Sequence, residues 1–378
     1  MLRHLTAGES HGKAIIGILE GVPANLKVSP EDINKELKRR MLGYGRGGRM
    51  AIETDNIEVL SGIRLGKTLG SPIALMIENK DYENWKKIMP VEASKNIFQE
   101  PVTKIRPGHA DLTGCLKYNQ QDIRNILERA SARSTAALVA IGAVAKKLLS
   151  EFKISVFSHV VQIGKVRANV DLRKGLEEAR RAAEKSDVRC ADEKAALQMK
   201  KEIDEAKTKG DSLGGVFEVV VTGAPVGLGS HVHADRRLGG KLAGAVMSIN
   251  AVKGVEIGLG FSVASVPGSK AHDELFNEAG NIVRHSNNAG GLEGGMTNGE
   301  PIIIRAAVKP VSTIKKTLNS VDLITKESVK AHFERADVCH IPSAGVIGEA
   351  VVAIEMAGAF LEKFGGDSIE EIKARYAP

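Results

Sequence analysis

A long run of small and apolar residues constrains the fold of this chain most. From Asp122 to about Phe152 the pattern predicts one long helix, which after Arg133 continues as Ala-Ala-Leu-Val-Ala-Ile-Gly-Ala-Val-Ala. A helix that is apolar on all sides needs protein around it, so we expect this one to be buried between layers. A second long helix of small residues is predicted at 344–364.

The composition agrees with a core made of such elements. Hydrophobic residues make up 43% of the chain but aromatic residues only 4%, so Val, Ile, Leu and Ala must fill the core, and 40 glycines allow backbones to approach closely. The 378 residues permit one large domain or two smaller ones. The three cysteines show no metal-ligand or disulfide pattern, and no metal site is predicted.

Location and partners follow from charge and from the lack of apolar runs. The N-terminus lacks the apolar region of a signal peptide, and no run reaches the roughly 18 apolar residues of a membrane helix. We therefore expect a cytoplasmic protein that does not enter a membrane. The net charge of +7 suggests an anionic partner, and because the excess is modest it favours a charged small molecule as readily as nucleic acid.

Hydrophobic patterning predicts strands and helices in alternation. Ser29 and Pro30, followed by early carboxylates, are typical of the start of a helix that should end before Gly43. Residues 172–209 should form exposed helices with solvated charges rather than a site. Strands are predicted at 13–22, 71–78, 154–161, 216–222 and 301–310, a further helix at 235–250, and a loop at 285–299.

Two arginines at the start of the long apolar helix suggest an anion site. Arg129 and Arg133 stand four residues apart, so on a continuous helix their Cβ atoms would lie about 5–6 Å apart on one face. Ser131 and Ser134 beside them are small and leave the guanidinium groups uncovered. The alternative is an ordinary solvated face of a helix.

Two histidines occur in turns that could expose them. Ser10 and His11 lie between Gly8 and Gly12, just before the first predicted strand, where a simple hairpin loop is the alternative. The Pro-Gly pair after Arg106 fixes a turn that should display Arg106 together with His109. A neighbouring Asp111 would raise the proton affinity of His109 and the arginine would lower it, although a lone histidine in a turn is often idle.

Two glycine-rich segments could contact phosphate. Residues 39–49 carry four arginines among glycines and suggest either a basic lid over a phosphate or an RNA-binding element. The glycines of 285–299, followed by a strand and then Lys309, suit a phosphate or a flat polar ring. No Walker loop and no dinucleotide-binding glycine fingerprint is present.

Seven motifs together resemble the chorismate synthase family, in order and over nearly the whole chain. The single departure is Ala336, where serine, histidine or phenylalanine is expected beside Arg335. The motifs are GESHG at 8–12, RPGHAD at 106–111, ERASARST at 128–135, SINAVKGVEIG at 248–258, NNAGGLEGGMTNG at 287–299, KPVST at 309–313 and RADVC at 335–339.

The resemblance implies a fold and a reaction. The fold would be an α+β single domain over residues 1–378, a β-α-β sandwich with long central helices between antiparallel sheets, assembled as a homotetramer. The reaction would be the last step of the shikimate pathway, in aromatic amino-acid biosynthesis. A carbon–oxygen lyase (EC 4.2.3.5) would remove phosphate from 5-enolpyruvylshikimate 3-phosphate by anti 1,4-elimination, giving chorismate. The small-molecule substrate would be the partner, with no nucleic acid and no membrane.

The family also implies a flavoprotein. Reduced FMN is required although the reaction has no net redox change, FAD is the related flavin, and NADPH (NADP) is a possible reductant. Residues that match flavin contacts are Arg129, Ala130, Ser131, Asn250, Ala251, Gly294, Lys309, Pro310, Val311, Ser312, Thr313 and Arg335.

Further roles come from the same resemblance. Arg40 and Arg46 match positions that serve NADPH or the anionic end of the substrate, and Ser10, Arg49, Arg106 and Arg133 would bind the substrate. His11 would protonate the departing phosphate. His109 would lie by the flavin ring and stabilise its reduced anionic form. Asp337 would take a proton from the flavin nitrogen at ring position five.

Two other classes of protein stay open at this point. A flavin oxidoreductase would share the ring-binding features but would need a hydride acceptor. A nucleic-acid-binding protein would use residues 39–49 as a phosphate patch, and its binding would collapse with added salt. The family motifs leave open whether such an enzyme reduces its own flavin with NADPH.

Overall fold

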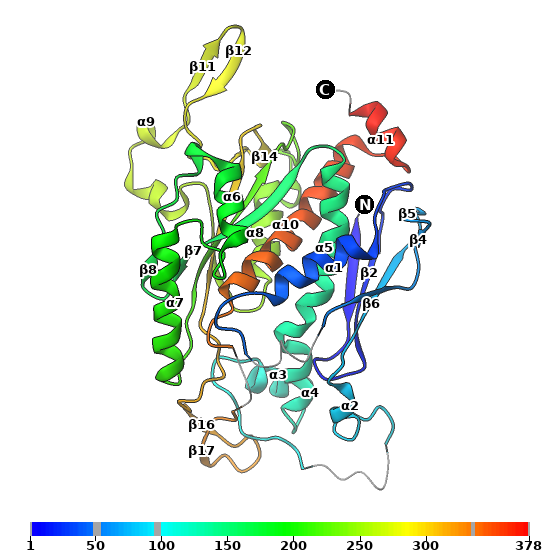
Figure 1. Cartoon of the computed structure of the whole chain (residues 1–378), viewed down its shortest axis with the longest axis vertical. Helices are drawn as coiled ribbons and strands as arrows, with labels where there is room; N and C mark the ends of the chain where they lie inside the picture. Colours follow the sequence, from blue (N-terminus) through cyan, green and yellow to red (C-terminus); the bar gives the residue numbers. More distant parts are fainter. Residues whose placement is uncertain (1, 48–53, 94–99, 334–336, 377–378) are drawn as a thin grey trace.

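The computed structural model describes residues 2–47, 54–93, 100–333 and 337–376, and it confirms the predicted α+β class (Figure 1). Within these residues, two larger antiparallel sheets are formed. The first has the order β1 (Arg3–Ala7), β2 (Ala14–Glu20), β6 (Ile73–Glu78), β3 (Ile57–Val59). The second has the order β10 (Val252–Ile257), β15 (Ile302–Val308), β9 (Gly215–Thr222), β7 (Ser155–Ile163), β8 (Val166–Arg167).

The remaining described elements are helices and two-stranded hairpins. The α-helices are α1 (Pro30–Met41), α2 (Tyr82–Trp85), α3 (Asp111–Tyr118), α4 (Arg124–Ala130), α5 (Thr135–Ser150), α6 (Leu176–Lys185), α7 (Glu193–Thr208), α8 (Leu238–Met247), α9 (Gly268–Ala271), α10 (Ile341–Phe364) and α11 (Ile369–Arg375). The hairpins are β4 (Ile63–Arg64) with β5 (Lys67–Thr68), β11 (Leu275–Glu278) with β12 (Asn281–Arg284), β13 (Leu292–Glu293) with β14 (Met296–Thr297), and β16 (Asn319–Val321) with β17 (Ser328–Lys330).

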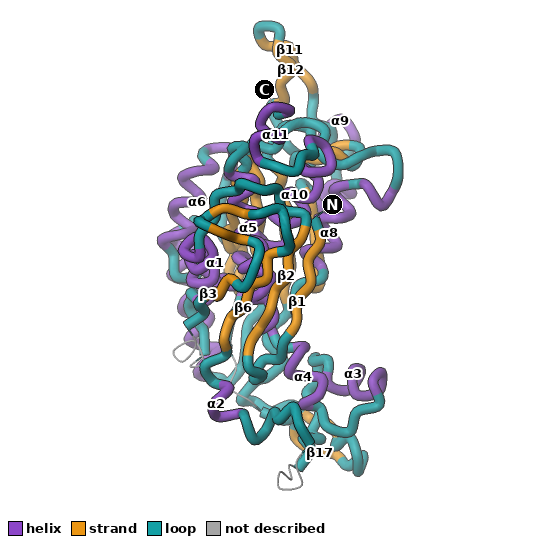
Figure 2. The backbone as a smooth tube through the Cα atoms, turned by 90° about the vertical axis from the view of Figure 1, so that its right-hand side faces the viewer, coloured by secondary structure: helices purple, strands orange, loops and turns teal. Residues whose placement is uncertain are grey.

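The two longest apolar helices lie between the sheets. Helix α5 packs on β2 and β6 of the first sheet, α10 packs on β7 and β9 of the second, and the two helices pack on each other (Figures 1 and 2). Gly142 makes this last contact possible, because a Cβ atom there would lie 2.4 Å from the Cβ of Ala350 and 2.5 Å from its Cα. The burial predicted for both helices is confirmed.

Contrary to the expectation that no run would be long and apolar enough for a membrane helix, α10 meets that requirement by length and composition. However, 83% of its most apolar window is buried within the structure. This is the behaviour of a core helix, and Gly348 shows how close the packing is, because a Cβ there would lie 2.5 Å from a ring carbon of Phe217 on β9.

The start of α1 is formed as the sequence predicts. Ser29 caps the helix through its hydroxyl, which accepts the backbone N–H of Asp32, and the Asp32 carboxylate in turn accepts the backbone N–H of Ser29 at 3.0 Å. This reciprocal pair is a capping box, with Pro30 at the first helical position. The helix ends at Met41, before Gly43 as expected.

The prediction of one continuous helix from Asp122 to Phe152 is wrong. Helix α4 ends at Ala130, and Ser131 adopts an extended conformation with ψ of 143°. A short 3₁₀ helix, η2 (Ala132–Ser134), then leads into α5. The cause is local, because the Ser131 hydroxyl accepts the backbone N–H of Arg133 at 3.3 Å and so caps a new turn.

Residues 285–299 were expected to be a loop but contain the β13–β14 hairpin. Helix α8 also begins three residues later than predicted, at Leu238, after the 3₁₀ turn η4 (Ala234–Arg236). The other 3₁₀ turns among the described residues are η3 (Leu172–Lys174) and η5 (Gly260–Ser265).

A small lobe projects from the end of the body where α5 begins (Figure 2). It contains α3, α4 and the β16–β17 hairpin, and it has an apolar cluster separate from the main core. The buried members of this cluster are Ile105, Cys115, Ile123, Leu127 and Leu323. The lobe therefore has its own packing.

The close contact of α5 with α10 gives a first prediction. Replacing Gly142 by Ala should destabilise the protein by about 1–3 kcal/mol, because the new methyl group would overlap Ala350. Gly358→Ala on α10 is the matched control, since no atom lies within 4 Å of a Cβ there. That change should stabilise the protein by about 0.4–1 kcal/mol. Urea unfolding of both variants checks this, and equal effects would contradict it.

Candidate active site

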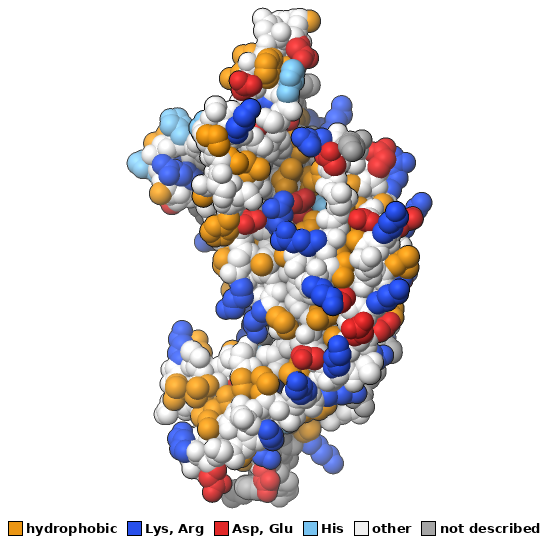
Figure 3. Space-filling view, turned by 90° about the vertical axis from the view of Figure 1, so that its left-hand side faces the viewer, with side chains coloured by type: hydrophobic (Ala, Val, Ile, Leu, Met, Phe, Trp, Pro, Cys, Tyr) orange, Lys and Arg blue, Asp and Glu red, His pale blue; other side chains and the backbone are white. Residues whose placement is uncertain are grey.

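A hollow opens between the small lobe and the body, and Lys and Arg side chains occupy parts of its wall (Figure 3). Backbone and side-chain contacts bring five distant segments together here. The links are Ser10 N–H to the Glu128 carbonyl at 3.0 Å, Asn250 Nδ2 to the Ala130 carbonyl at 3.0 Å, and Lys309 N–H to the Ala251 carbonyl at 2.9 Å. A fourth link, from Lys309 Nζ to the Gly108 carbonyl at 2.6 Å, joins the lobe.

His11 is held by contacts with Glu128 and Trp85. Its Nδ1 donates to Glu128 Oε1 at 2.8 Å, and its backbone N–H donates to Glu128 Oε2 at 2.7 Å. The imidazole also stacks on the indole ring of Trp85, with ring centroids 3.8 Å apart. With Nδ1 bound to the carboxylate, Nε2 is the nitrogen left for a ligand. The expectation that Ser10 would be exposed is wrong, since it is only 3% exposed.

Arg106, His109 and Asp111 form one cluster, as the Pro-Gly turn predicts. Arg106 Nη2 lies 3.1 Å from His109 Nδ1, and Arg106 donates to Asp111 through Nε at 2.8 Å and Nη2 at 3.0 Å. His109 Nδ1 also contacts Asp111 Oδ1 at 2.5 Å. Burial alone would raise the pKa of Asp111, but the hydrogen bonds and charges of His109 and Arg106 lower it to about 2.

Two buried arginines share a single carboxylate. Arg133 donates to Asp55 through Nη1 and to Asn79 Oδ1 through Nε at 2.8 Å. Arg40 approaches the other oxygen of Asp55 at 3.2 Å and donates to Thr135 Oγ1 at 3.0 Å. Burial lowers the pKa of Arg40 to about 9, so it stays charged at neutral pH. Two cations on one anion leave a local excess of positive charge, which suits an anionic ligand.

Arg129 and Arg133 do not share a face, contrary to prediction. The break at Ser131 turns Arg129 toward the first strand, where it donates to the Thr6 carbonyl at 2.8 Å and to the Gly8 carbonyl at 3.1 Å. Arg129 is exposed, whereas Arg133 is 5% exposed in the cluster with Asp55.

Asp337 lies before the first turn of α10 and contacts residues of the arginine- and glycine-rich segment 39–49. Its Oδ2 is 3.0 Å from Arg46 Nη1, and its Oδ1 accepts the backbone N–H of Gly47 at 2.6 Å. His340 lies nearby, and burial lowers its pKa to about 4. The charge of Asp337 raises the pKa of His340, whereas the charges of Arg46 and Lys309 lower it further. His340 is therefore neutral at physiological pH.

The residues 309–313, which are predicted to contact the flavin, follow directly after β15. Burial lowers the pKa of Lys309, with a contribution from Lys253. Thr313 Oγ1 lies 3.5 Å from Arg106 Nη1, and the Val311 carbonyl accepts the Ser212 hydroxyl at 2.7 Å. The stretch from Lys309 through Pro310 and Ser312 to Thr313 thus borders both Asn250 and the Arg106 cluster.

Among the described residues that are predicted to contact the flavin, Gly294 lies apart from the rest. It lies in the β13–β14 hairpin, whose Gly295 carbonyl accepts the backbone N–H of Leu238 at the start of α8. Asn250 follows the other end of α8, and ten helical residues span about 15 Å. Arg49 and Arg335 lie outside the described residues.

Some site residues were missed by the sequence predictions. Glu128, Asp55, Asn79 and Trp85 hold His11, Arg40 and Arg133 in place, yet no local motif marks them apart from the position of Glu128 in ERASARST. Within the residues that the structure describes, no group of three or more His, Cys, Asp or Glu side chains could hold a metal ion.

Comparison with known proteins adds a family to this geometry. The sequence model of the family described as chorismate synthase matches residues 2–361. Chorismate synthase from Syntrophotalea carbinolica is 57% identical over 98% of this chain and 96% of its own length, and that from Aquifex aeolicus is 56% identical over 99% and 96%. A crystal structure of chorismate synthase is 46% identical, with a TM-score of 0.79 over 99% of this chain and 96% of the other.

The lowered pKa of Asp111 predicts a dependence of stability on pH. An aspartate has a pKa of about 3.9 when unfolded. Since its pKa in the folded protein is about 2, the pairing stabilises the fold above about pH 4 and is lost as the pH falls toward 2.

Asp111→Asn should therefore cost about 2 kcal/mol at pH 7 and progressively less below pH 4. Urea unfolding of wild type and variant at pH 7, 4 and 3 measures the difference. A cost that does not change with pH would contradict the assignment.

Proposed function

The chain belongs to the chorismate synthase family, and on that premise we propose how its site removes phosphate from 5-enolpyruvylshikimate 3-phosphate in the last step of the shikimate pathway. The enzyme is a carbon–oxygen lyase (EC 4.2.3.5). The observation that carries the proposal is the buried excess of positive charge around Asp55, which Asn79 connects to the turn that carries His11, a histidine held by Glu128.

The arginines supply the binding of the substrate. It carries two carboxylates and a phosphate, and planar guanidinium groups bind such anions in pairs. Arg133 and Arg106 are held by carboxylates in fixed orientations, so they can receive a ligand with little reorganisation. We assign Arg40 to the substrate as well, since it shares Asp55 with Arg133. Ser10 and Arg49 complete the proposed substrate set.

His11 is the proposed general acid. As the carbon–oxygen bond breaks, its Nε2 would give a proton to the departing phosphate, while Glu128 and Trp85 keep the ring in place. Because Nδ1 is engaged by Glu128, Nε2 is the ring nitrogen from which the proton would be transferred.

Reduced FMN is the proposed cofactor, and the residues present fit it. The wall formed by Arg129, Ala130, Ser131, Asn250, Ala251 and the 309–313 segment offers amide, hydroxyl and cationic donors beside the substrate cluster, as a phosphate-bearing ring requires. When bound, reduced FMN would supply electron density that weakens the carbon–oxygen bond and is recovered at the end.

The protein groups beside the cofactor would control protons. We propose that His109, fixed by Asp111 and Arg106, faces the ring, and that Asp337 holds a proton during the reaction while Arg46 and Gly47 orient its carboxylate. Arg46 remains the candidate for NADPH, and Arg335 for the flavin.

We also propose that the two sheets with α5 and α10 between them form the sandwich of this family, as a single cytoplasmic domain and a homotetramer. The separation of Gly294 from Asn250 along α8 is compatible with such an assembly, in which Gly294 of another subunit would contact the flavin. Sedimentation with and without FMN would test this.

The direct test is anaerobic turnover of 5-enolpyruvylshikimate 3-phosphate, following chorismate absorbance with FMN either reduced by dithionite or oxidised. Chorismate with reduced FMN alone supports the proposal, and a parallel reaction with NADPH tells whether the enzyme reduces its own flavin. Net NADPH oxidation coupled to turnover would instead indicate an oxidoreductase, and absence of chorismate from folded, flavin-loaded protein would overturn the proposal.

His11→Ala should lower turnover by about 10²–10⁴-fold, because a general acid typically contributes that much. Binding of FMN should be retained. His285→Ala is the matched control, since His285 stacks on Phe276 in the β11–β12 hairpin, outside the site. Unchanged turnover of the His11 variant would remove this residue from the mechanism.

A further inference from the structure

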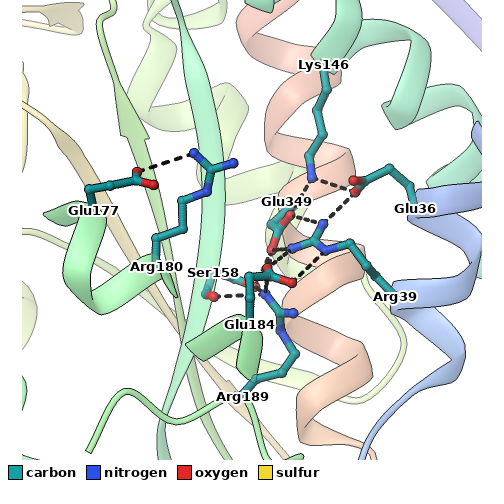
Figure 4. A network of polar contacts seen from close by, with 9 residues as sticks. All are labelled: Glu36, Arg39, Lys146, Ser158, Glu177, Arg180, Glu184, Arg189 and Glu349. Carbon is teal, nitrogen blue, oxygen red and sulfur yellow. Dashed lines mark hydrogen bonds and ion pairs between the residues drawn. The ribbon is translucent and has the colours of Figure 1, made fainter. Parts of the chain in front are cut away.

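A network of charges centred on a buried carboxylate connects the helices α1, α5 and α10 (Figure 4). Its centre is Glu349 on α10, which is completely buried. Three cations and two further carboxylates surround it, so the charges balance. These are Arg39, Lys146 and Arg189, with Glu36 and Glu184.

Each oxygen of Glu349 is fully used. Oε1 accepts from Ser158 Oγ at 2.6 Å, from Arg39 Nη2 at 2.9 Å and from Arg189 Nη2 at 3.0 Å. Oε2 accepts from Arg39 Nη1 at 2.7 Å and from Lys146 Nζ. Burial alone would raise the pKa of Glu349, but the three cations hold it far below its usual range. One carboxylate therefore joins α1, α5, α10 and β7.

The three helices tied by Glu349 are those that lead to the candidate active site. Arg39 precedes Arg40, whose guanidinium binds Asp55. Lys146 belongs to α5, which begins just after Arg133, and α10 begins just after Asp337. On α5 the network lies about 16 Å from the first residue, at 1.5 Å per residue. None of the network residues is thus predicted to bind substrate or cofactor, but the network fixes the helices that lead to the residues that are.

Stability alone does not account for such a network. A buried ion pair can often be replaced by apolar residues without loss of stability, because removing charges from water is costly. What apolar side chains do not supply is a fixed orientation, whereas the guanidinium fork of Arg39 on Glu349 sets the rotation of α1 against α10.

We propose that Glu349 is a positioning residue for catalysis, which sets α1, α5 and α10 so that Arg40 and Arg133 meet the substrate, and Asp337 the cofactor beside it, at the correct separations. The inference rests on the proposed function, because it assumes that Arg40 and Arg133 bind 5-enolpyruvylshikimate 3-phosphate and that Asp337 acts beside the cofactor.

The first variant is Glu349→Gln, which keeps the shape of the side chain and removes its charge. The KM for the substrate should rise about tenfold or more, since small displacements far from the chemistry cost about that much, while kcat changes less. Substrate binding to the enzyme with oxidised FMN, measured by calorimetry, should weaken by the same factor, which gives a readout independent of turnover.

Glu218→Gln is the matched control. Glu218 is also a buried carboxylate, 4% exposed, bound by Arg305 Nη2 at 2.9 Å and His159 Nε2 at 3.0 Å, but its partners lie on neighbouring strands of the second sheet. This variant should lose stability with a KM within twofold of wild type. Equal rises of KM in both variants would overturn the proposal.

A second variant separates positioning from stability. Glu349→Gln with Lys146→Met restores the balance of charge, so its Tm should recover toward that of wild type. The KM should stay high, because Arg39 keeps Glu36 and Glu184 but has lost the carboxylate of α10 that fixes α1 against α10. A KM that recovers together with Tm would mean that Glu349 only stabilises the fold. If wild type itself makes no chorismate, the proposed function fails instead, so the two failures are distinguishable.

Discussion

The close packing of α5 on α10 is the contact on which the rest of the structure depends. Gly142 faces Ala350 at a distance that excludes any side chain, so the two backbones approach closely. Each helix has its other face on a different sheet, which leaves the carboxylate of Glu349 completely buried. A charge in such a place must be matched completely, and two of the side chains that match it, Arg39 and Lys146, come from helices that lead to the candidate active site. The close packing of α5 on α10 and the balance of charge around Glu349 thus favour the same arrangement of the helices.

The secondary structure was largely predictable because its signals are local. The capping box at Ser29 and the apolar periodicity of α10 depend on residues within a few positions of one another. The break at Ser131 was not predicted, although its cause is local too. A hydroxyl that accepts the N–H two residues later competes with the helical hydrogen bond, and the apolar residues on both sides gave no sign of which would form.

The residues of the candidate site also divide into those that the local sequence predicts and those that it does not. Arg106, His109 and Asp111 lie within six residues, so their cluster followed from the turn between them. The partners of His11 and Arg133 could not be found like this, since Glu128 is 117 positions from His11 and Asp55 is 78 positions from Arg133. Resemblance to a family supplied the proposed functional residues but not the carboxylates that orient them. Those required the fold.

The separate apolar cluster of the small lobe has a consequence for motion. Arg106 and His109 belong to a unit whose core, around Ile105 and Leu323, is far smaller than the main one. Such a unit can open at a lower free energy than the whole protein, and its amide protons then exchange with solvent first. A ligand that contacts both sides of the hollow binds only the closed form. Ligand binding and local folding of the lobe are therefore thermodynamically linked, and each strengthens the other.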